Sequence, residues 1–394
     1  MSLPLYRDHQ APQALPEQGH RGLWYERFFD RYDTDWTIFK EKSDKGKILQ
    51  REGKASWVED NAKLAGQGDA LELAVQRQLE LATSLGGRGA VFKADWHFAT
   101  GLGLPHPVEN GLAWHHTLGV PYLAGSAVKS LVRAWVEVWD DPLDESERKR
   151  RLETWFGFAD KRVSVEGESR ERNVSQAGAF RFFDALPLKP VSLRTDVMTP
   201  HLGKWYEQGG EIEDWQREPD KVPADWHAPV PVPFLVAHKP SLLFSIAPRR
   251  PDCPKVELDA VFEALKQALD WLGGGAKTAV GYGHLLESPS STDDLYRQQR
   301  EKMEQEAFAQ LTPEQQILKR LQQQFEGERQ GNTKPDAGGA FMAEVRQRLD
   351  QGIAWPTAER LQLAELVETI YGYVGWGNSG KKRERKALIA KLRD

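Results

Sequence analysis

The sequence has 394 residues, a formal net charge of −5 at pH 7 and one cysteine, Cys253. This length allows a sizeable core and more than one folded unit. The negative charge excludes a uniformly basic protein, so nucleic-acid binding would need a local basic patch. One cysteine excludes an internal disulfide and fits a reducing compartment, so we expect a cytoplasmic protein. The sequence contains no run of 18 or more apolar residues, so we expect no membrane span.

The first 88 residues are predicted to form an N-terminal helical region. Residues 1–18 lack the apolar stretch of a signal peptide, and we expect a flexible lead there. Residues 20–85 are charged and carry apolar residues that could supply buried helix faces: Leu23, Trp24, Phe28, Leu64, Leu71, Val75 and Leu79. The cluster GGRG at residues 86–89 separates this region from the next part of the chain.

A strand is predicted over residues 91–100, and a helix over 126–139. The helix has an apolar stripe at i, i+3, i+4, i+7 spacing, which predicts one buried face: Val128, Leu131, Val132, Trp135, Val138 and Trp139. Ser126 is a good N-cap residue, Lys129 lies in the first turn and Arg133 comes one turn later. The unpaired amides and partial positive charge of a helix start suit a phosphate. The alternative is that the two cations only solvate the outer face.

Residues 89–287 are predicted to form one α+β domain. Further strands are expected at 179–184, 234–237, 241–247 and 279–286, with a helix at 258–272 that ends at three glycines. The order strand, helix, strand, strand, helix, strand is that of a ferredoxin-like unit, which RRM-like RNA-recognition modules share. Two segments interrupt it. Residues 160–178 are polar and predicted to be an exposed loop or excursion, and residues 196–231 are rich in Pro, Gly and Trp without a period.

A linker is predicted from Ser288 onward, and after it a C-terminal helical extension, residues 293–394. Thr312 is expected to begin a helix there, with Pro313 at the first position and Gln315 completing a capping box. A break at 331–339 divides the extension into two helical groups. Its basic end is either a patch for RNA or an acidic partner, or a solvated helix face.

Five motifs carry a resemblance to a known family. The motif GVPYLAGSAVK at 119–129 resembles the Gly-x-Pro-Tyr block of the RAMP superfamily, the RNA-binding proteins of CRISPR effector complexes. The motif GGGAKTAVGYG at 273–283 is similar to the glycine loop near the end of such a domain. Within the family, the remaining motifs resemble the sixth RAMP subunit of type III-B (Cmr) complexes: PVENG at 107–111, FFDALP at 182–187, and DVMTPH at 196–201 with PADWH at 223–227.

The resemblance implies a ferredoxin-like palm with a projecting thumb hairpin, located in 196–231 or 160–178. It also implies a non-catalytic structural subunit that holds guide RNA toward its 3′ end. The implied partners are guide RNA, target single-stranded RNA and neighbouring RAMP subunits. In such complexes the target-cutting aspartate belongs to a different subunit, so no catalytic residue is carried over, and no cofactor or metal is expected. The candidate RNA-binding residues are Gly125, Ser126, Lys129, Arg133, Lys277, Thr278, Gly281, Tyr282 and His201.

The glycine loop is not a nucleotide-binding Walker loop. Such a loop needs glycine before its lysine and lies between a strand and a helix, whereas here Ala276 precedes Lys277 and the loop comes after a helix. We expect close backbone approach to a ligand or to the first helix, with Lys277, Thr278 and Tyr282 facing a phosphate. The alternative is a plain helix stop.

Two other features point to chemistry. His115 and His116 favour an alternative function, an endoribonuclease that processes CRISPR transcripts, because imidazoles can act on an RNA 2′-hydroxyl. Adjacent residues in an extended chain point to opposite faces, however, so the pair would not form one site. Asp184 is interpreted as a turn residue or, less favourably, as a nuclease carboxylate. No His or Cys spacing matches a zinc site.

Overall fold

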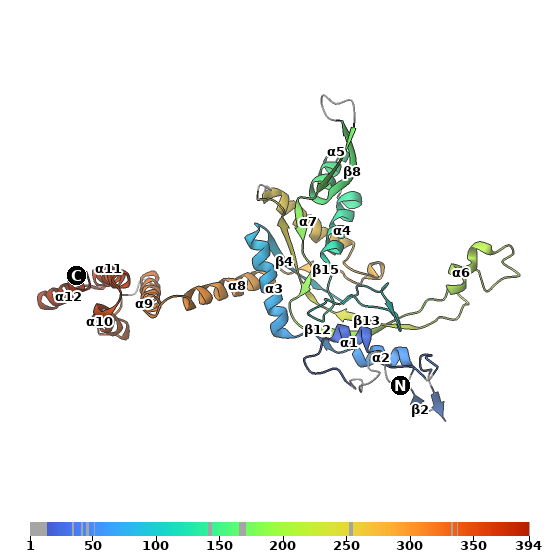
Figure 1. The fold of residues 1–394 in the computed structure, drawn as a ribbon, viewed down its shortest axis with the longest axis horizontal. Helices are drawn as coiled ribbons and strands as arrows, with labels where there is room; N and C mark the ends of the chain where they lie inside the picture. Colours follow the sequence, from blue (N-terminus) through green and yellow to red (C-terminus); the bar gives the residue numbers. More distant parts are fainter. Residues whose placement is uncertain are drawn as a thin grey trace. The chain divides into compact units, whose positions relative to one another are not determined.

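The computed structural model describes residues 14–33, 35–40, 42–44, 47–50, 52–140, 144–164, 171–251, 255–331, 334–336 and 338–393. The chain forms two compact units, Met1–Asp294 and Leu295–Asp394 (Figure 1). Most of the predicted flexible lead lies outside the described residues. The expected mixed architecture of helices and antiparallel sheets is confirmed.

The first unit begins with three helices, α1 (Arg21–Arg27), α2 (Gly53–Asn61) and α3 (Gly68–Ser84). Two short strand pairs accompany these helices. Between α1 and α2 in the chain, β1 (Lys42–Asp44) pairs with β2 (Lys47–Gln50), and after α3, β6 (Pro105–His106) pairs with β7 (Glu109–Asn110). The predicted apolar stripe of α3 is buried. Leu64 is instead 61% exposed, because it lies in a short edge strand, β3 (Leu64–Ala65), and not in a helix.

A five-stranded antiparallel sheet forms the centre of the first unit. Its order is β10-β14-β4-β15, and β11 also pairs with β14. The strands are β4 (Arg88–Ala94), β10 (Phe180–Phe182), β11 (Leu186–Pro187), β14 (Ser241–Pro248) and β15 (Leu285–Glu287). Strand β14 is buried along nearly its whole length, which requires cover on both faces of the sheet.

Helices supply that cover. The helices α4 (Gly125–Ala134) and α7 (Lys255–Trp271) pack against each other, and their apolar residues share one core with Phe92 and Phe244 of the sheet. On the other face, Gln78 of α3 donates to the Ser245 hydroxyl at 3.2 Å. Because alternate strand residues point to opposite faces, Phe244 and Ser245 mark the two covered sides.

A second, four-stranded sheet has the order β3-β12-β13-β5. Its remaining strands are β5 (His97–Phe98), β12 (Val191–Met198) and β13 (Val232–His238). Residues 196–231, predicted to be a long stretch without a period, therefore begin inside β12, and the part outside this strand starts only after Met198. Between β12 and β13 it contains α6 (Gly203–Gln208) and the 3-10 turn η4 (Gly209–Glu211).

Residues 160–178, predicted to be an exposed loop, belong largely to a β-hairpin. Strand β8 (Gly157–Ser164) pairs antiparallel with β9 (Glu171–Ala177). Its polar sequence shows no alternating pattern, and the described side chains of β9, residues 173–177, are all exposed. The helix α5 (Glu145–Arg151) and the π-helical turn η3 (Leu152–Phe156) lead into the hairpin (Figure 1).

The predicted helix 126–139 is found with two corrections. It begins as α4 and ends in a π-helical turn, η2 (Trp135–Trp139). A π turn contains more residues than an α turn, so the apolar stripe loses its phase. Val138 and Trp139 are accordingly 64% and 58% exposed, although they were predicted to be buried.

The predicted last strand, 279–286, is also shorter. A 3-10 turn, η5 (Thr278–Val280), precedes β15. Gly281 and Gly283 have φ values of +90° and +67°, which no extended strand contains.

The second unit is helical. The predicted linker from Ser288 is instead mostly the first turns of α8 (Pro289–Ala309), a helix that continues past the boundary between the units. After it come α9 (Pro313–Gln330), α10 (Ala340–Gln351), η6 (Gly352–Ala354), α11 (Thr357–Val374) and α12 (Ser379–Arg393). The capping box of Thr312 and Gln315 is confirmed. The helices α9 to α12 have a core of their own, and the break at 331–339 lies partly outside the described residues.

Candidate nucleic-acid interface

The glycine loop (residues 273–283) is fastened by its backbone to β5 and the residue after it. The Ala276 amide donates to the Ala99 carbonyl at 2.7 Å, and the Gly283 amide donates to the His97 carbonyl at 2.7 Å. The Gly274 amide closes the loop on the Gly283 carbonyl at 2.8 Å. These bonds join the end of α7 to the second sheet, so the loop lies where the two sheets meet.

The glycines permit this close approach. Gly275 has φ +98°, and a Cβ there would lie 2.2 Å from the Ala99 carbonyl oxygen. A Cβ on Gly283 would lie 1.9 Å from the Gly274 oxygen. A Cβ on Gly274 would be in ordinary contact with Leu123, at 3.4 Å, two residues before α4. The tightest contacts of the loop are therefore with residue Ala99 and with the loop itself, and the predicted approach to the first helix stays a prediction.

Lys277 is the cation that this loop presents. Its backbone is left-handed, with φ +59° and ψ +31°, a conformation that L residues other than Gly, Asn and Asp rarely adopt. Its ammonium Nζ lies 5.7 Å from the centre of the Phe234 ring and 5.9 Å from that of Tyr282. No described carboxylate forms an ion pair with it. Thr278 is half-buried beside it, and Gly281 is exposed.

Tyr282 does not face a phosphate, contrary to the prediction. Its side chain is buried, and its hydroxyl donates to the Asp196 carboxylate of β12. Burial, reinforced by Asp196, raises the pKa of Tyr282 well above its usual value. Glycines on both sides let the ring turn inward, so Tyr282 positions the loop.

Asp196 also lies near His97, which forms a pair with His238 that the sequence did not single out as a site. The His97 Nε2 atom lies 3.9 Å from Asp196 Oδ2, and His97 Nδ1 lies 3.3 Å from His238 Nδ1. Burial lowers the pKa of His97, and Asp196 opposes that effect. The ring of Trp96, 43% exposed, is stacked on His97 with centroids 4.6 Å apart. Their common location results from strand pairing, which no local motif reveals.

The start of α4 differs from the prediction. Its N-cap is Ala124, and no side chain caps the helix locally, so Ser126 is not the cap. Instead, the carboxylate of Asp184, 59 residues further along the chain, accepts the Gly125 amide at 2.6 Å. A carboxylate therefore occupies part of the place expected for a phosphate. Gly125 is required there because a Cβ would lie 2.3 Å from the Phe182 carbonyl oxygen.

The two cations of α4 have different surroundings. The Lys129 Nζ atom donates to the Phe156 carbonyl at 2.8 Å, and burial, then Arg249 and Arg133, lowers the pKa of Lys129. Arg133 is exposed, and its Nε atom lies 3.7 Å from Glu137 Oε2 in the following turn, η2. Of the two, Arg133 has the side chain that solvent reaches more freely.

Of the two histidines in the alternative nuclease hypothesis, His115 is bound within its own turn and His116 is exposed, so the hypothesis stays a prediction. His20 Nδ1 accepts the Leu23 amide at 2.9 Å, so its Nε2 carries the proton and donates to the carbonyls of His115 and His116 at 3.2 and 3.0 Å. His115 Nδ1 accepts the Leu118 amide at 3.3 Å, and burial lowers its pKa. His116 is exposed, and so is His201, which precedes α6.

The described part of the chain contains no group of three His, Cys, Asp or Glu side chains arranged to hold a metal ion. None of its helices combines the length and the apolar character that a bilayer span requires.

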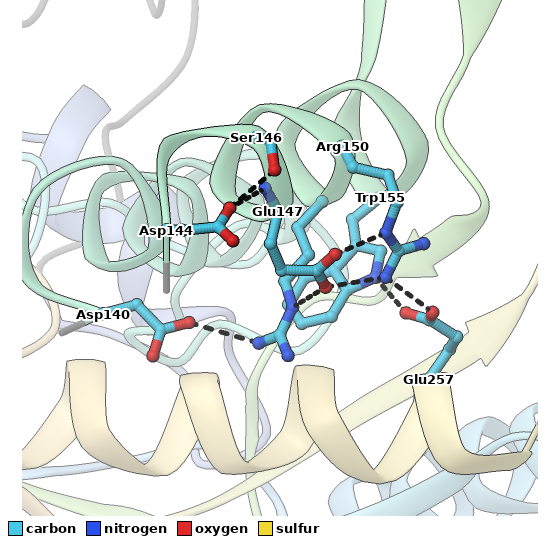
Figure 2. A network of polar contacts seen from close by, with 8 residues as sticks. Asp140, Asp144, Ser146, Glu147, Arg150, Trp155 and Glu257 are labelled. Atoms are coloured by element: carbon cyan, nitrogen blue, oxygen red, sulfur yellow. Dashed lines mark hydrogen bonds and ion pairs between the residues drawn. The ribbon is translucent and has the colours of Figure 1, made fainter. Parts of the chain in front are cut away.

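A polar network that the sequence did not predict fixes the base of the β8–β9 hairpin to α7 (Figure 2). Glu257, in the first turn of α7, accepts from Trp155 Nε1 at 2.6 Å and from Arg150 at 3.2 Å. Arg150 also binds Glu147 through two hydrogen bonds of 2.8 Å. The spacing of Glu147, Arg150 and Arg151 at i, i+3 and i+4 was the available signal, but the partner on α7 is distant in sequence.

Comparisons with curated proteins give two relatives. The chain is 27% identical to the CRISPR system Cmr subunit Cmr6 of Pyrococcus furiosus over 253 residues, 54% of this chain and 71% of that protein. It is 27% identical to Cmr6 of Saccharolobus solfataricus over 176 residues, 44% of this chain and 47% of that protein. The predicted similarity to this subunit of Cmr complexes is confirmed.

Two solved structures are also similar. A type III-B Cmr-beta complex bound to cognate target RNA contains a chain with a TM-score of 0.38 and 19% identity, covering 59% of this chain and 69% of its own. Cmr6 from Pyrococcus furiosus gives a TM-score of 0.28 and 24% identity, covering 51% and 98%.

The sequence also matches the model of a protein family. The model of the RAMP superfamily matches residues 79–286. This range is more than half of the chain, and it contains the central sheet, α4, α7 and the glycine loop. The chain belongs to the RAMP superfamily.

Proposed function

We propose that the protein is a non-catalytic, RNA-binding structural subunit of a type III-B CRISPR effector complex, holding guide RNA toward its 3′ end. Membership in the RAMP superfamily and the Cmr6 relatives support the proposal. The single structural observation that carries it is Lys277, a cation held in a rare left-handed conformation and unpaired with any described carboxylate. Neighbouring RAMP subunits and target RNA are its proposed partners.

The first unit supplies a ferredoxin-like palm in this proposal. The elements β4, α4, β10, β14, α7 and β15 succeed one another in the order strand, helix, strand, strand, helix, strand. Their strands pair antiparallel in the spatial order β10-β14-β4-β15. The helices α4 and α7 share a core with one face of this sheet. These features support the palm assignment.

The thumb is the β8–β9 hairpin in this proposal. The hairpin is a paired, two-stranded projection, whereas residues 199–231 contain only short helical turns among the described elements. The network around Glu257 holds the hairpin base against α7 (Figure 2). An element that contacts a neighbouring subunit needs such a fixed base, because otherwise ordering on binding would cost affinity.

The proposed RNA contact is made to the backbone. Lys277, Thr278 and Gly281 form its centre, and Arg133 is the solvent-accessible cation of α4. Tyr282 and Asp196 hold the loop in position. Phosphate contacts of this kind position an RNA without reading its sequence, as a subunit that accepts many guides requires.

Lys277→Ala tests the RNA contact directly. Single-stranded RNA binding should weaken, and the slope of log affinity against log salt should fall by about 0.7, the value for one lost phosphate contact on a single strand. Fluorescence anisotropy at several salt concentrations measures both. Lys266→Ala is the matched control, because it removes the same charge from an ammonium that lies 3.6 Å from Glu287. An unchanged slope for Lys277→Ala would remove this residue from the site.

The nuclease alternative has its own test. Incubation with CRISPR repeat RNA should leave the RNA intact, since His115 is committed to its own turn. Cleavage that disappears in His116→Ala would contradict the non-catalytic assignment.

A further inference from the structure

Besides the glycine loop, the first unit has a concave surface that carries several positive charges. Its cavity of about 340 Å³ is formed by strand ends and turns of both sheets. Three lysines, Lys93, Lys189 and Lys239, line it and define what we call the lysine pocket. The other polar lining residues are His238, Ser192, Ser241 and Ser291, and no aspartate or glutamate is among the lining residues.

The three lysines have no carboxylate partner among the described residues, unlike Lys54, Lys204 and Lys266. Each of the three is exposed. Three like charges around one concavity repel one another, so an anion in the pocket would be favoured electrostatically.

Lys239 adds an independent observation. It sits at the turn between β13 and β14 with φ +48°, in the left-handed region that glycine adopts without strain. Its amide donates to the Trp96 carbonyl at 2.8 Å, which holds this conformation. Backbone strain of this kind is concentrated at ligand-binding positions, and here it places a lysine at the rim of the pocket.

Trp96 connects the pocket to the glycine loop. Its carbonyl binds Lys239, its ring stacks on His97, and its ring lies edge-on to Tyr282 with centroids 4.9 Å apart. The neighbouring His238 lines the pocket and contacts His97. An exposed indole therefore belongs to a residue that contacts both the pocket, at Lys239, and the glycine loop, at Tyr282. Interleaved cations and aromatic rings are typical of surfaces that bind single-stranded nucleic acid.

We propose that the lysine pocket is a second phosphate-binding site, which takes the RNA backbone that continues from the glycine loop across Trp96. The lysines bind phosphodiester oxygens, and Trp96 offers its ring to a base. The pocket also has an apolar wall of Leu64, Leu188 and Pro190, against which a ribose or base can pack. This inference rests on the proposed RNA-binding function.

The test compares two triple variants by anisotropy with labelled single-stranded RNA. Lys93→Ala/Lys189→Ala/Lys239→Ala should lower affinity at least tenfold and reduce the salt slope by about 2, at about 0.7 per phosphate contact. Lys54→Ala/Lys204→Ala/Lys266→Ala changes the net charge equally and should leave the slope nearly unchanged. Equal effects of the two triples would overturn the pocket and leave only a general charge effect.

Lys239→Gly separates charge from folding. Glycine relieves the left-handed strain, so the melting temperature should stay the same or rise while RNA affinity falls. Trp96→Ala should also weaken binding, and Trp96→Phe should retain it. If Lys239→Gly and the variant with all three pocket lysines replaced keep full RNA affinity while Lys277→Ala loses affinity, this inference is wrong and the proposed function still stands. A wild-type protein that binds no RNA overturns both.

Discussion

At the residue scale, the side chains that hold the candidate site in place form their hydrogen bonds with other groups of the protein. Tyr282 and Asp196 bind each other, and Asp184 binds the first amide of α4. Each of these was visible in the sequence as a polar residue in a motif. The pairing itself was not visible in the sequence, because 86 residues separate Tyr282 from Asp196 and 59 residues separate Asp184 from Gly125.

Tyr282→Phe should destabilise the protein modestly. Loss of the hydrogen bond to a partly exposed carboxylate is expected to lower the free energy of unfolding by about 1–2 kcal/mol at pH 7. The pKa of Tyr282 is raised in the folded protein, so its stabilising contribution is complete below the unfolded tyrosine pKa of about 10 and declines as pH rises above it.

Urea unfolding of wild type and Tyr282→Phe at pH 7 and pH 11 measures this effect. The difference in unfolding free energy between the two proteins should shrink at the higher pH. A difference that is equal at both values would show that the Tyr282 hydroxyl is not held as described.

At the scale of elements, the sequence predicted those that have a periodic pattern. The buried face of α3, the helix α7 that ends at glycines and the capping box at Thr312 are found as expected. The failures have physical causes: the π turn after α4 shifts the apolar phase, and the described side chains of β9, residues 173–177, are all exposed, so they show no alternation. The lysine pocket could not be predicted, because Lys93, Lys189 and Lys239 come together only through strand pairing.

Gly275→Ala tests the glycine loop as an element. The residue combines φ +98° with a Cβ position 2.2 Å from the Ala99 oxygen, so alanine should lower the free energy of unfolding by more than about 1 kcal/mol. Displacement of the loop should also weaken RNA binding. Thermal unfolding and anisotropy measure the two effects.

Gly103→Ala is the matched control for this substitution. Nothing lies within 4 Å of a Cβ built on Gly103, and its φ lies outside the left-handed region. It should therefore be nearly neutral in both assays. A Gly275→Ala protein that behaves like Gly103→Ala would contradict the close packing of the loop on β5.

At the scale of the whole molecule, a net charge of −5 is compatible with RNA binding because the relevant cations are local. Lys277 and the lysine pocket lie on one unit, near the junction of its two sheets, and none of these lysines is neutralised by a described carboxylate. Local potential, more than net charge, attracts an anionic ligand to such a surface. The second unit has its own core, and the proposed RNA contacts do not depend on it.

Cross-link mapping tests the central claim most directly. Guide RNA that contains 4-thiouridine would be bound to the full-length chain and irradiated, and the cross-linked peptides would be identified by mass spectrometry. We predict cross-links within residues 273–283 and at Trp96, which Lys277→Ala reduces. Cross-links confined to residues 295–394, or to the β8–β9 hairpin, would contradict the claim that the glycine loop holds the RNA.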